Sequence, residues 1–275
     1  MKSINVKGKL IDFSIPKIMG IVNVTPDSFF DESRSLDFDR IKSRIVRMIE
    51  EEVDILDVGG YSTRPGAKEV EINEEIDRVV PVIEWISNEF PEVITSIDTF
   101  RSEVAKKAIN AGAGIINDVS GGNLDKEMFA TVSALKVPYI LMHMRGTPQS
   151  MQSLTVYENL TEQVIQELQS KLKILNELAL SDIIVDPGFG FAKTMEQNYK
   201  LFKDLDQFKI FNRPLLVGIS RKSMINTYLE IEAKDALNAT TILNTVALMK
   251  GADILRVHDV KEAVEVRKLL TNNIL

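Results

Sequence analysis

Four polar residues at widely separated points of the chain could together bind a flat heterocycle. Asp98 and Asp186 each follow a short apolar run, Asn117 follows another, and Lys222 stands in the sequence Ser-Arg-Lys-Ser. A carboxylate accepts two N–H bonds side by side, which matches the edge of an aminopyrimidine, whereas lysine and asparagine donors suit a ring carbonyl and ring nitrogens. These residue types predict recognition of such a ring, provided that the fold brings them together.

A second set of residues could bind an anion. Arg256 and His258 are separated by one residue, so alternation along a strand puts both side chains on one side. Asn23, which ends the first long apolar run, adds an amide. Together these three residues predict a cationic, hydrogen-bonding patch suited to a phosphate group.

The sequence lacks the motifs of covalent catalysis and of dinucleotide binding. It has no P-loop and no nucleophile elbow, and Gly188-Phe189-Gly190 lacks the glycine spacing and context of a dinucleotide-binding turn. Because the chain has no cysteine, thiolate zinc sites and a cysteine nucleophile are excluded. Ring recognition combined with anion binding is the chemistry that the sequence indicates.

The elements that must position these residues are eight short apolar runs separated by segments of helical spacing. The runs are residues 18–24, 54–58, 93–97, 115–116, 139–142, 183–185, 215–219 and 254–257. Between them, apolar residues recur at 3.6-residue spacing, as at Ile41, Ile45 and Met48. Eight alternating units predict a (β/α)8 TIM barrel, in the α/β class. A doubly wound open sheet is the alternative, although such sheets more often have five to seven strands.

In a (β/α)8 barrel the catalytic groups stand at the C-terminal ends of the strands, and phosphate is commonly bound after strands seven and eight. Here every run ends in polar residues. Ser220 to Ser223 follow the seventh run, and Arg256 lies near the end of the eighth. Residues 4–13 predict a hairpin that closes the barrel bottom, with its turn at Lys7-Gly8-Lys9. Since no linker or low-complexity segment interrupts the chain, we expect residues 1–275 to form a single domain.

Charge and composition exclude several classes of partner. The chain has 33 Lys and Arg against 40 Asp and Glu, a net charge of −7, which argues against a protein held on nucleic acid by phosphate contacts. No run of 18 apolar residues could span a membrane, and residues 1–9 lack the apolar core of a signal peptide. We therefore expect a cytoplasmic protein that binds neither nucleic acid nor membrane.

Taken in order, these residues and their neighbours resemble the dihydropteroate synthase family of pterin-binding enzymes. The resemblance runs from residue 19 to about 260, so it covers nearly the whole chain. The matching blocks are Asn-Val-Thr-Pro-Asp-Ser-Phe at 23–29, Asp-Val-Gly-Gly at 57–60, Ser-Thr-Arg-Pro-Gly at 62–66, Ser-Ile-Asp-Thr at 96–99, Ile-Asn-Asp-Val-Ser-Gly-Gly at 116–122, Met-His-Met-Arg-Gly-Thr-Pro at 142–148, Asp-Pro-Gly-Phe-Gly-Phe at 186–191, Ser-Arg-Lys-Ser at 220–223 and Arg-Val-His-Asp-Val at 256–260.

The resemblance implies a homodimeric transferase that uses Mg²⁺ in folate biosynthesis. It would condense 6-hydroxymethyl-7,8-dihydropterin pyrophosphate with p-aminobenzoate, giving 7,8-dihydropteroate and pyrophosphate. The resemblance assigns the pterin to Asp98, Asn117, Met142, Asp186, Gly218 and Lys222. It assigns the pyrophosphate to Asn23, Arg64, Arg256 and His258, with the metal at Asn23. The p-aminobenzoate pocket would comprise Thr63, Pro65, Phe191, Lys222 and Ser223. The catalytic groups would be Asp98, Lys222, Arg256 and His258.

Two related functions are alternatives: a pterin-dependent methyltransferase, which handles no pyrophosphate, and a non-catalytic paralogue that still binds pterin. The blocks at 220–223 and 256–258 favour the synthase. The chain departs from the family pattern at Tyr61, where many members have a small or acidic residue, and at Ala192, where glycine is frequent. It also has Asn-Ala-Thr-Thr at 238–241, where an alanine-rich start of the helix before strand eight is more usual. None of these departures removes a binding group.

Overall fold

The structure, a computed structural model, describes residues 2–24, 34–62 and 69–271. Its main sheet has eight parallel strands in the order β8-β7-β6-β5-β4-β3-β10-β9. A parallel bridge between Val185 and Leu215 joins the two ends of this order, so the sheet closes on itself. The strands are β3 (Lys17–Asn23), β4 (Ile55–Gly59), β5 (Ile94–Asp98), β6 (Ile115–Asp118), β7 (Tyr139–Met142), β8 (Ile183–Asp186), β9 (Leu216–Val217) and β10 (Ile254–Val257). The predicted (β/α)8 barrel is confirmed.

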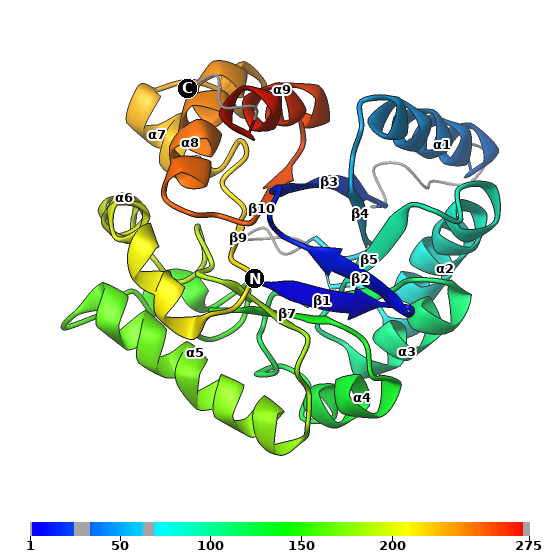
Figure 1. Cartoon of the computed structure of the whole chain (residues 1–275), viewed down its shortest axis with the longest axis horizontal. Coiled ribbons are helices and arrows are strands. Elements are labelled where there is room, and N and C mark those ends of the chain that lie inside the picture. The colour runs from blue at the N-terminus through cyan, green and yellow to red at the C-terminus, as the bar shows by residue number, and fades with distance from the viewer. Residues whose placement is uncertain (1, 25–33, 63–68, 272–275) are drawn as a thin grey trace.

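Helices surround the strands on the outside, as Figure 1 shows. Their apolar faces pack against the outward side chains of the strands, as Val79 and Ile83 do from one helix. The α-helices are α1 (Arg34–Glu50), α2 (Ile72–Glu89), α3 (Ser102–Ala111), α4 (Met128–Leu135), α5 (Leu160–Glu177), α6 (Met195–Lys203), α7 (Ser223–Leu229), α8 (Leu237–Met249) and α9 (Val260–Thr271). The described residues also form the short 3₁₀ helices η3 (Met151–Ser153), η4 (Leu205–Phe211) and η5 (Ala233–Asp235).

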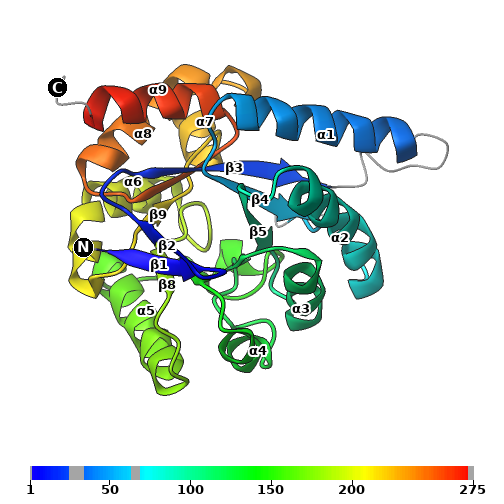
Figure 2. The same cartoon turned by 45° about the vertical axis from the view of Figure 1, so that its right-hand side comes forward.

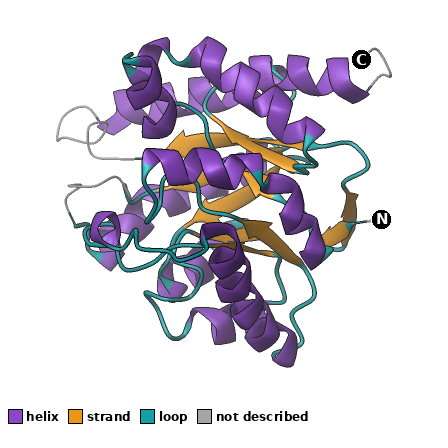
Figure 3. Ribbon diagram, turned by 90° about the vertical axis from the view of Figure 1, so that its left-hand side faces the viewer, coloured by secondary structure: helices purple, strands orange, loops and turns teal. Residues whose placement is uncertain are grey.

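A β-hairpin precedes the barrel and closes one end of it (Figures 2 and 3). Strands β1 (Ser3–Val6) and β2 (Lys9–Asp12) are antiparallel, with Val6 opposite Lys9. Lys7 and Gly8 between them both have positive φ, 51° and 84°, as the favoured two-residue hairpin turn requires. Ile4 and Val6 belong to a buried cluster with Phe13 and the first inward-facing residues of the barrel strands. The predicted hairpin at the barrel bottom is confirmed.

The barrel interior changes from apolar to polar along the strands. The lowest inward-facing residues are apolar: they include Met19, Ile55, Ile115, Ile140, Ile184, Leu216 and Ile254. Because side chains alternate along a strand, the residues two positions further on face the same interior. Four of these are Asp57, Asn117, Asp186 and Arg256. An apolar floor therefore lies beneath a polar layer near the C-terminal end of the barrel.

Two strands differ from the sequence expectation by more than one residue. The run at 215–219 contributes only Leu216 and Val217 to a strand, whereas the run at 115–116 continues as a strand to Asp118. Pairing of Asn117 with Asp98, and of Asp118 with Leu141, accounts for the longer strand, because neighbours on both sides hold it extended. Within the described ranges, no helix combines the length and apolar character needed to cross a bilayer.

Candidate active site

The polar layer of the barrel is built from alternate strands. Asp57 lies in β4, Asn117 in β6, Asp186 in β8 and Arg256 in β10, an arrangement typical of the packed layers of this fold. Asp57, Asn117 and Asp186 are at most 6% exposed. The closed barrel thus brings together carboxylate, amide and guanidinium groups that are far apart in the chain.

Arg256 is held by two carboxylates. Its Nε atom lies 2.7 Å from Oδ2 of Asp57, and its Nη2 atom lies 2.5 Å from Oδ2 of Asp98. Burial alone would lower the pKa of Arg256, but these two carboxylates raise it, so the guanidinium stays charged. Burial raises the pKa of Asp98, and Arg256 opposes that shift. The guanidinium therefore points into the barrel, toward the residues expected to face the pterin.

Asp57 is a functional candidate that the sequence analysis did not assign. Besides Arg256, its Oδ2 atom accepts a hydrogen bond from Nδ2 of Asn117 at 2.9 Å. Its Oδ1 atom is buried and has no hydrogen-bond partner in the described part of the chain. The available signal was an acidic residue inside an apolar strand segment, Ile-Leu-Asp-Val-Gly, because charged side chains are rarely buried without a partner. Asp57 orients both Arg256 and Asn117.

Lys222 stands at the N-terminal end of α7, where its charge interacts with those of Asp186 and Arg256 in this layer. Its Nζ atom donates to the carbonyl oxygen of Phe189 and lies 4.8 Å from the centroid of the Phe191 ring. Burial lowers the pKa of Lys222 to about 8, and Asp186 opposes the shift. A Cβ atom at Gly218 would lie 3.9 Å from this Nζ atom, so the missing side chain leaves space beside the ammonium group.

Met142 and Asp186 occupy paired positions in β7 and β8. Met142 is 3% exposed and belongs to a small apolar cluster with Val119 and Ala192, against which Phe191 packs. Burial raises the pKa of Asp186, with Lys222 acting in the other direction. The structure therefore brings together Asp98, Asn117, Met142, Asp186 and Lys222, the residues expected to bind pterin, along with Phe191.

The charge of His258 differs from the sequence expectation, in which this residue belongs to a cationic patch. Its Nδ1 atom lies 3.0 Å from Oγ of Ser220, at the start of the turn that leads to Lys222. Burial lowers the pKa of His258 to about 4, and Arg256 and Arg44 lower it further. The imidazole is consequently neutral at neutral pH, because it is partly desolvated next to two guanidinium groups. Arg256 alone supplies the charge of this pair.

The remaining predicted residues lie at the rim or beyond the described ranges. Asn23 and Ser223 are exposed, at the end of β3 and the start of α7 respectively. Thr63, Arg64 and Pro65 lie outside the described residues, as does the block at 25–29.

Two of the departures from the family pattern, at Tyr61 and Ala192, have local explanations. Tyr61 packs edge-to-face on Phe100, with 5.0 Å between ring centroids, and the Arg101 guanidinium lies 5.1 Å from its ring. Ala192 is fully buried with φ at 50°, in the left-handed region that glycine enters most easily. This backbone conformation explains why glycine is frequent at position 192.

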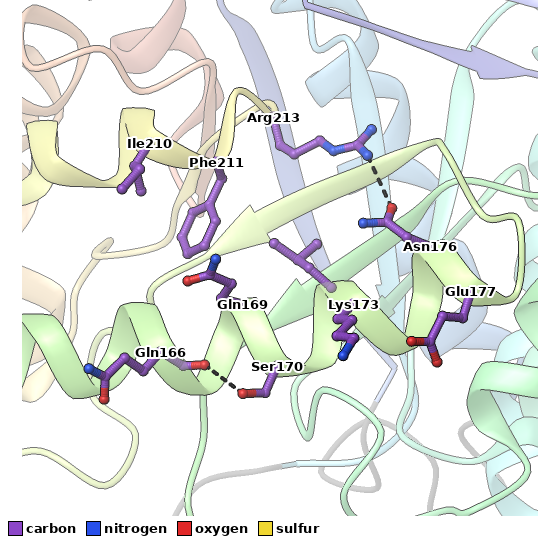
Figure 4. A pocket seen from close by; sticks show the side chains of 10 residues that line it. Gln166, Gln169, Ser170, Lys173, Asn176, Glu177, Ile210, Phe211 and Arg213 are labelled. Carbon is purple, nitrogen blue, oxygen red and sulfur yellow. Dashed lines mark hydrogen bonds between the residues drawn. The ribbon is translucent and has the colours of Figure 1, made fainter.

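A hollow of about 830 Å³ lies elsewhere, between α5 and η4 (Figure 4). Arg213 beside it donates to Oδ1 of Asn176, and Ser170 donates to the carbonyl oxygen of Gln166. These residues come from outer helices and from the approach to β9, not from C-terminal strand ends. The hollow is therefore distinct from the polar layer of the barrel.

Comparison with known proteins identifies the class to which this barrel belongs. The chain is a member of the pterin binding enzyme family, whose sequence model matches residues 19–258. Within that class it is similar to dihydropteroate synthases. It is 41% identical to the Escherichia coli K12 enzyme over 268 residues, which cover 96% of this chain and 94% of the relative.

Two further relatives extend this similarity. The chain is 41% identical to the folic acid synthesis protein fol1 of Pneumocystis carinii, but the match spans only 37% of that longer protein and 96% of this chain. The structure of Xanthomonas albilineans dihydropteroate synthase with 4-aminobenzoic acid superposes with a TM-score of 0.90 at 34% identity, covering 98% of this chain and 97% of that one.

Proposed function

We propose that this protein is a dihydropteroate synthase that joins 6-hydroxymethyl-7,8-dihydropterin pyrophosphate to p-aminobenzoate. The observation that carries the proposal is the convergence of Asp98, Asn117, Asp186 and Lys222 around Arg256 in the polar layer of the barrel. Membership of the pterin binding enzyme family and the 41% identity to bacterial synthases support the same function.

The pterin would lie against Met142, with its ring edge toward Asp186 and Asn117. The Asp186 carboxylate would accept the N–H groups of the aminopyrimidine edge, and Asn117 and Lys222 would donate to ring nitrogens and the ring carbonyl. Gly218 would leave room for the ring beside Lys222. A buried carboxylate suits this role, because hydrogen bonds to charged groups are among the strongest in proteins.

In the proposed reaction, the bond between the pterin methylene carbon and the pyrophosphate oxygen breaks first. The pyrophosphate leaves with the bonding electrons, and the resulting cation is stabilised by the pterin ring. The Asp98 carboxylate would stabilise that positive charge electrostatically, while Arg256 and His258 would stabilise negative charge on the leaving group. The nitrogen lone pair of p-aminobenzoate then forms the new C–N bond, and that nitrogen releases a proton.

The residues at the mouth fit a magnesium ion held mainly by substrate. In the described part of the chain, no cluster of three or more acidic or histidine side chains could hold a metal by itself. Mg²⁺ is usually bound by one or two protein groups together with phosphate oxygens and water. The exposed amide oxygen of Asn23 is a suitable hard ligand at the C-terminal end of β3. When bound, the ion would neutralise charge on the pyrophosphate.

For p-aminobenzoate, the described part of the proposed pocket consists of Phe191, Lys222 and Ser223. The ammonium of Lys222 over the Phe191 ring combines an apolar wall with a cation, which suits an aromatic carboxylate. The solved Xanthomonas albilineans enzyme contains 4-aminobenzoic acid, the same compound, which supports this choice of substrate. Thr63 and Pro65 would complete the pocket, and Arg64 would contact the pyrophosphate.

Pyrophosphate release tests the proposal. The purified protein is mixed with the pterin pyrophosphate, p-aminobenzoate and Mg²⁺, and both pyrophosphate and dihydropteroate are measured. Equimolar formation of the two products is the expected result. Methyl transfer from a methylated pterin without pyrophosphate release would indicate the methyltransferase, and pterin binding without turnover would indicate the non-catalytic paralogue.

Homodimer formation, cytoplasmic location and organisation as one domain over residues 1–275 stay predictions. Sedimentation of the purified protein would check the first of them, since a dimer has twice the monomer mass of 30.9 kDa.

A further inference from the structure

A second polar cluster lies behind the loops that follow β7 and β8, and the proposed mechanism does not use it. His143 and Lys193 are 2% and 4% exposed. Nε2 of His143 lies 3.0 Å from Oε2 of Glu167 on α5, and Nδ1 of His143 lies 3.0 Å from Nζ of Lys193. The other oxygen of Glu167 accepts from Arg145, whose Nε atom is 3.0 Å away.

The hydrogen-bond partners and pKa values of Glu167 and His143 indicate their protonation states. Hydrogen bonds from His143 and Arg145 outweigh burial and lower the pKa of Glu167 to about 2, so its carboxylate can only accept. Burial and Lys193 lower the pKa of His143 to about 4, so the imidazole is neutral. Its single proton must then be on Nε2, facing Glu167, which leaves Nδ1 as an acceptor for Lys193.

Lys193 has two further acceptors, both in the loop that follows β8. Its Nζ atom lies 2.9 Å from the carbonyl oxygen of Gly188 and 3.0 Å from that of Phe191. With Nδ1 of His143, this makes three acceptors around one nitrogen. Only the ammonium form carries three N–H donors, so a neutral amine would leave one of the three acceptors without its hydrogen bond.

We propose that Lys193 is a positioning residue for the p-aminobenzoate pocket: its ammonium group fastens the loop of residues 188–191 to His143 and so holds the Phe191 ring against Lys222. The loop begins beside Asp186, whose Oδ1 atom accepts from the Gly188 backbone N–H at 2.7 Å. This inference rests on the proposed function, because it assigns Phe191 to the wall of that pocket.

The protonation of Lys193 gives this role a pH dependence. Burial lowers its pKa to about 7, Asp186 opposes the shift and Lys222 adds to it. As the pH rises through about 7, the Lys193 ammonium loses a proton, and one of its three hydrogen bonds is lost. The Michaelis constant for p-aminobenzoate is expected to rise in the same range. Several charged and titratable groups face Lys193 or its partner His143 from the packed elements. They are Asp186, Lys222, Glu167, Arg145, Lys171 and Tyr157, whose ring centroid lies 6.4 Å from that of His143.

Steady-state kinetics of Lys193→Met, with separate KM values for the two substrates, tests the proposal. The methionine keeps the length of the side chain and removes every donor. Losing a hydrogen bond to a charged group weakens binding ~10-fold or more, so KM for p-aminobenzoate should rise by about that factor at pH 6. KM for the pterin pyrophosphate should change less than about twofold, and the pH dependence near 7 should disappear. Lys203→Met, an exposed lysine on α6, is the matched control.

His143→Leu provides a second test that does not remove the lysine. Without Nδ1 the loop is no longer tied to His143, so KM for p-aminobenzoate should rise at pH 6, as in Lys193→Met. It should also become insensitive to pH near 7, because a neutral amine has two N–H donors for the two remaining carbonyl oxygens. An equal rise of both KM values in Lys193→Met would overturn the proposal, as would a wild-type pH profile in His143→Leu. A wild-type protein that forms no dihydropteroate would instead overturn the proposed function itself.

Discussion

Arg256 and Asp57 are 199 residues apart in the chain, yet Nε of the arginine lies 2.7 Å from Oδ2 of the aspartate. The same carboxylate oxygen accepts from Asn117, so one acidic side chain orients a proposed pyrophosphate contact, Arg256, and a proposed pterin contact, Asn117. Asp98 holds the other end of the guanidinium. The proposed substrate contacts are thus supported by ion pairs inside the barrel.

Asp57→Asn should destabilise the protein and weaken catalysis together. The substitution keeps the shape of the side chain but removes its charge, and a hydrogen bond to a charged group contributes ~1.5–3 kcal/mol. We expect the free energy of unfolding to fall by about that amount, measured as a lower urea midpoint with an unchanged slope. Asp39→Asn, an exposed aspartate on α1, should change it by less than ~0.5 kcal/mol. Equal small effects would contradict the supporting role of Asp57.

Asp186→Asn should lower the affinity for pterin. The amide presents a donor where the ring N–H groups need an acceptor, and the loss of ~1.5–3 kcal/mol corresponds to roughly 10- to 150-fold in the dissociation constant. Calorimetric titration with the pterin substrate measures this change. Asp206→Asn, an exposed aspartate of η4, serves as the control and should bind normally. Wild-type affinity in Asp186→Asn would remove this residue from the pterin site.

Pyrophosphate binding should be coupled to proton uptake by His258. Its pKa is lowered to about 4, so at pH 6 the imidazole is neutral before binding. A nearby anion favours the charged form and raises the pKa, so the complex gains a proton. The slope of the binding enthalpy against the ionisation enthalpy of the buffer, measured at pH 6, gives the number of protons taken up on binding. This number should be larger for the wild type than for His258→Gln, by up to one proton. Identical buffer dependence in the two proteins would show that His258 does not contact the anion.

Gly188→Ala should be far more damaging than Gly8→Ala. Both glycines have positive φ, 73° and 84°, so both substitutions incur the left-handed strain of ~1–2 kcal/mol. A Cβ at Gly188 would lie 1.9 Å from the His143 carbonyl oxygen, whereas one at Gly8 would meet nothing within 4 Å. Overpacking adds ~1–3 kcal/mol, and the 188–191 loop must shift. Thermal unfolding of both variants measures the difference; equal losses of stability would show that the loop can move freely.

The sequence predicted the barrel well because its strands are buried on both faces. Such strands form continuous apolar runs bounded by polar residues, and each crossover helix has its own periodicity. The hairpin was also predicted from the sequence, because Lys7-Gly8 can form a turn between two segments of alternating polarity. The length of the strand at 216–217 was overestimated, because the apolar run continues to Ile219 although the strand does not. Hydrogen bonding, which the residue types do not reveal, defines where this strand ends.

The sequence by itself determined which polar residues reach the C-terminal rim, because strand ends are local features that composition and alternation reveal. It also marked Arg256 and His258 as neighbours on one side of a strand. Only the tertiary structure decided their different roles: Arg256 turns inward to Asp57 and Asp98, whereas His258 lies against Ser220 and is neutral. Likewise, nothing in the local sequence pairs His143 with Lys193. Ion pairs, burial and pKa values depend on distances that arise only when the barrel closes, so residues far apart in the chain set them.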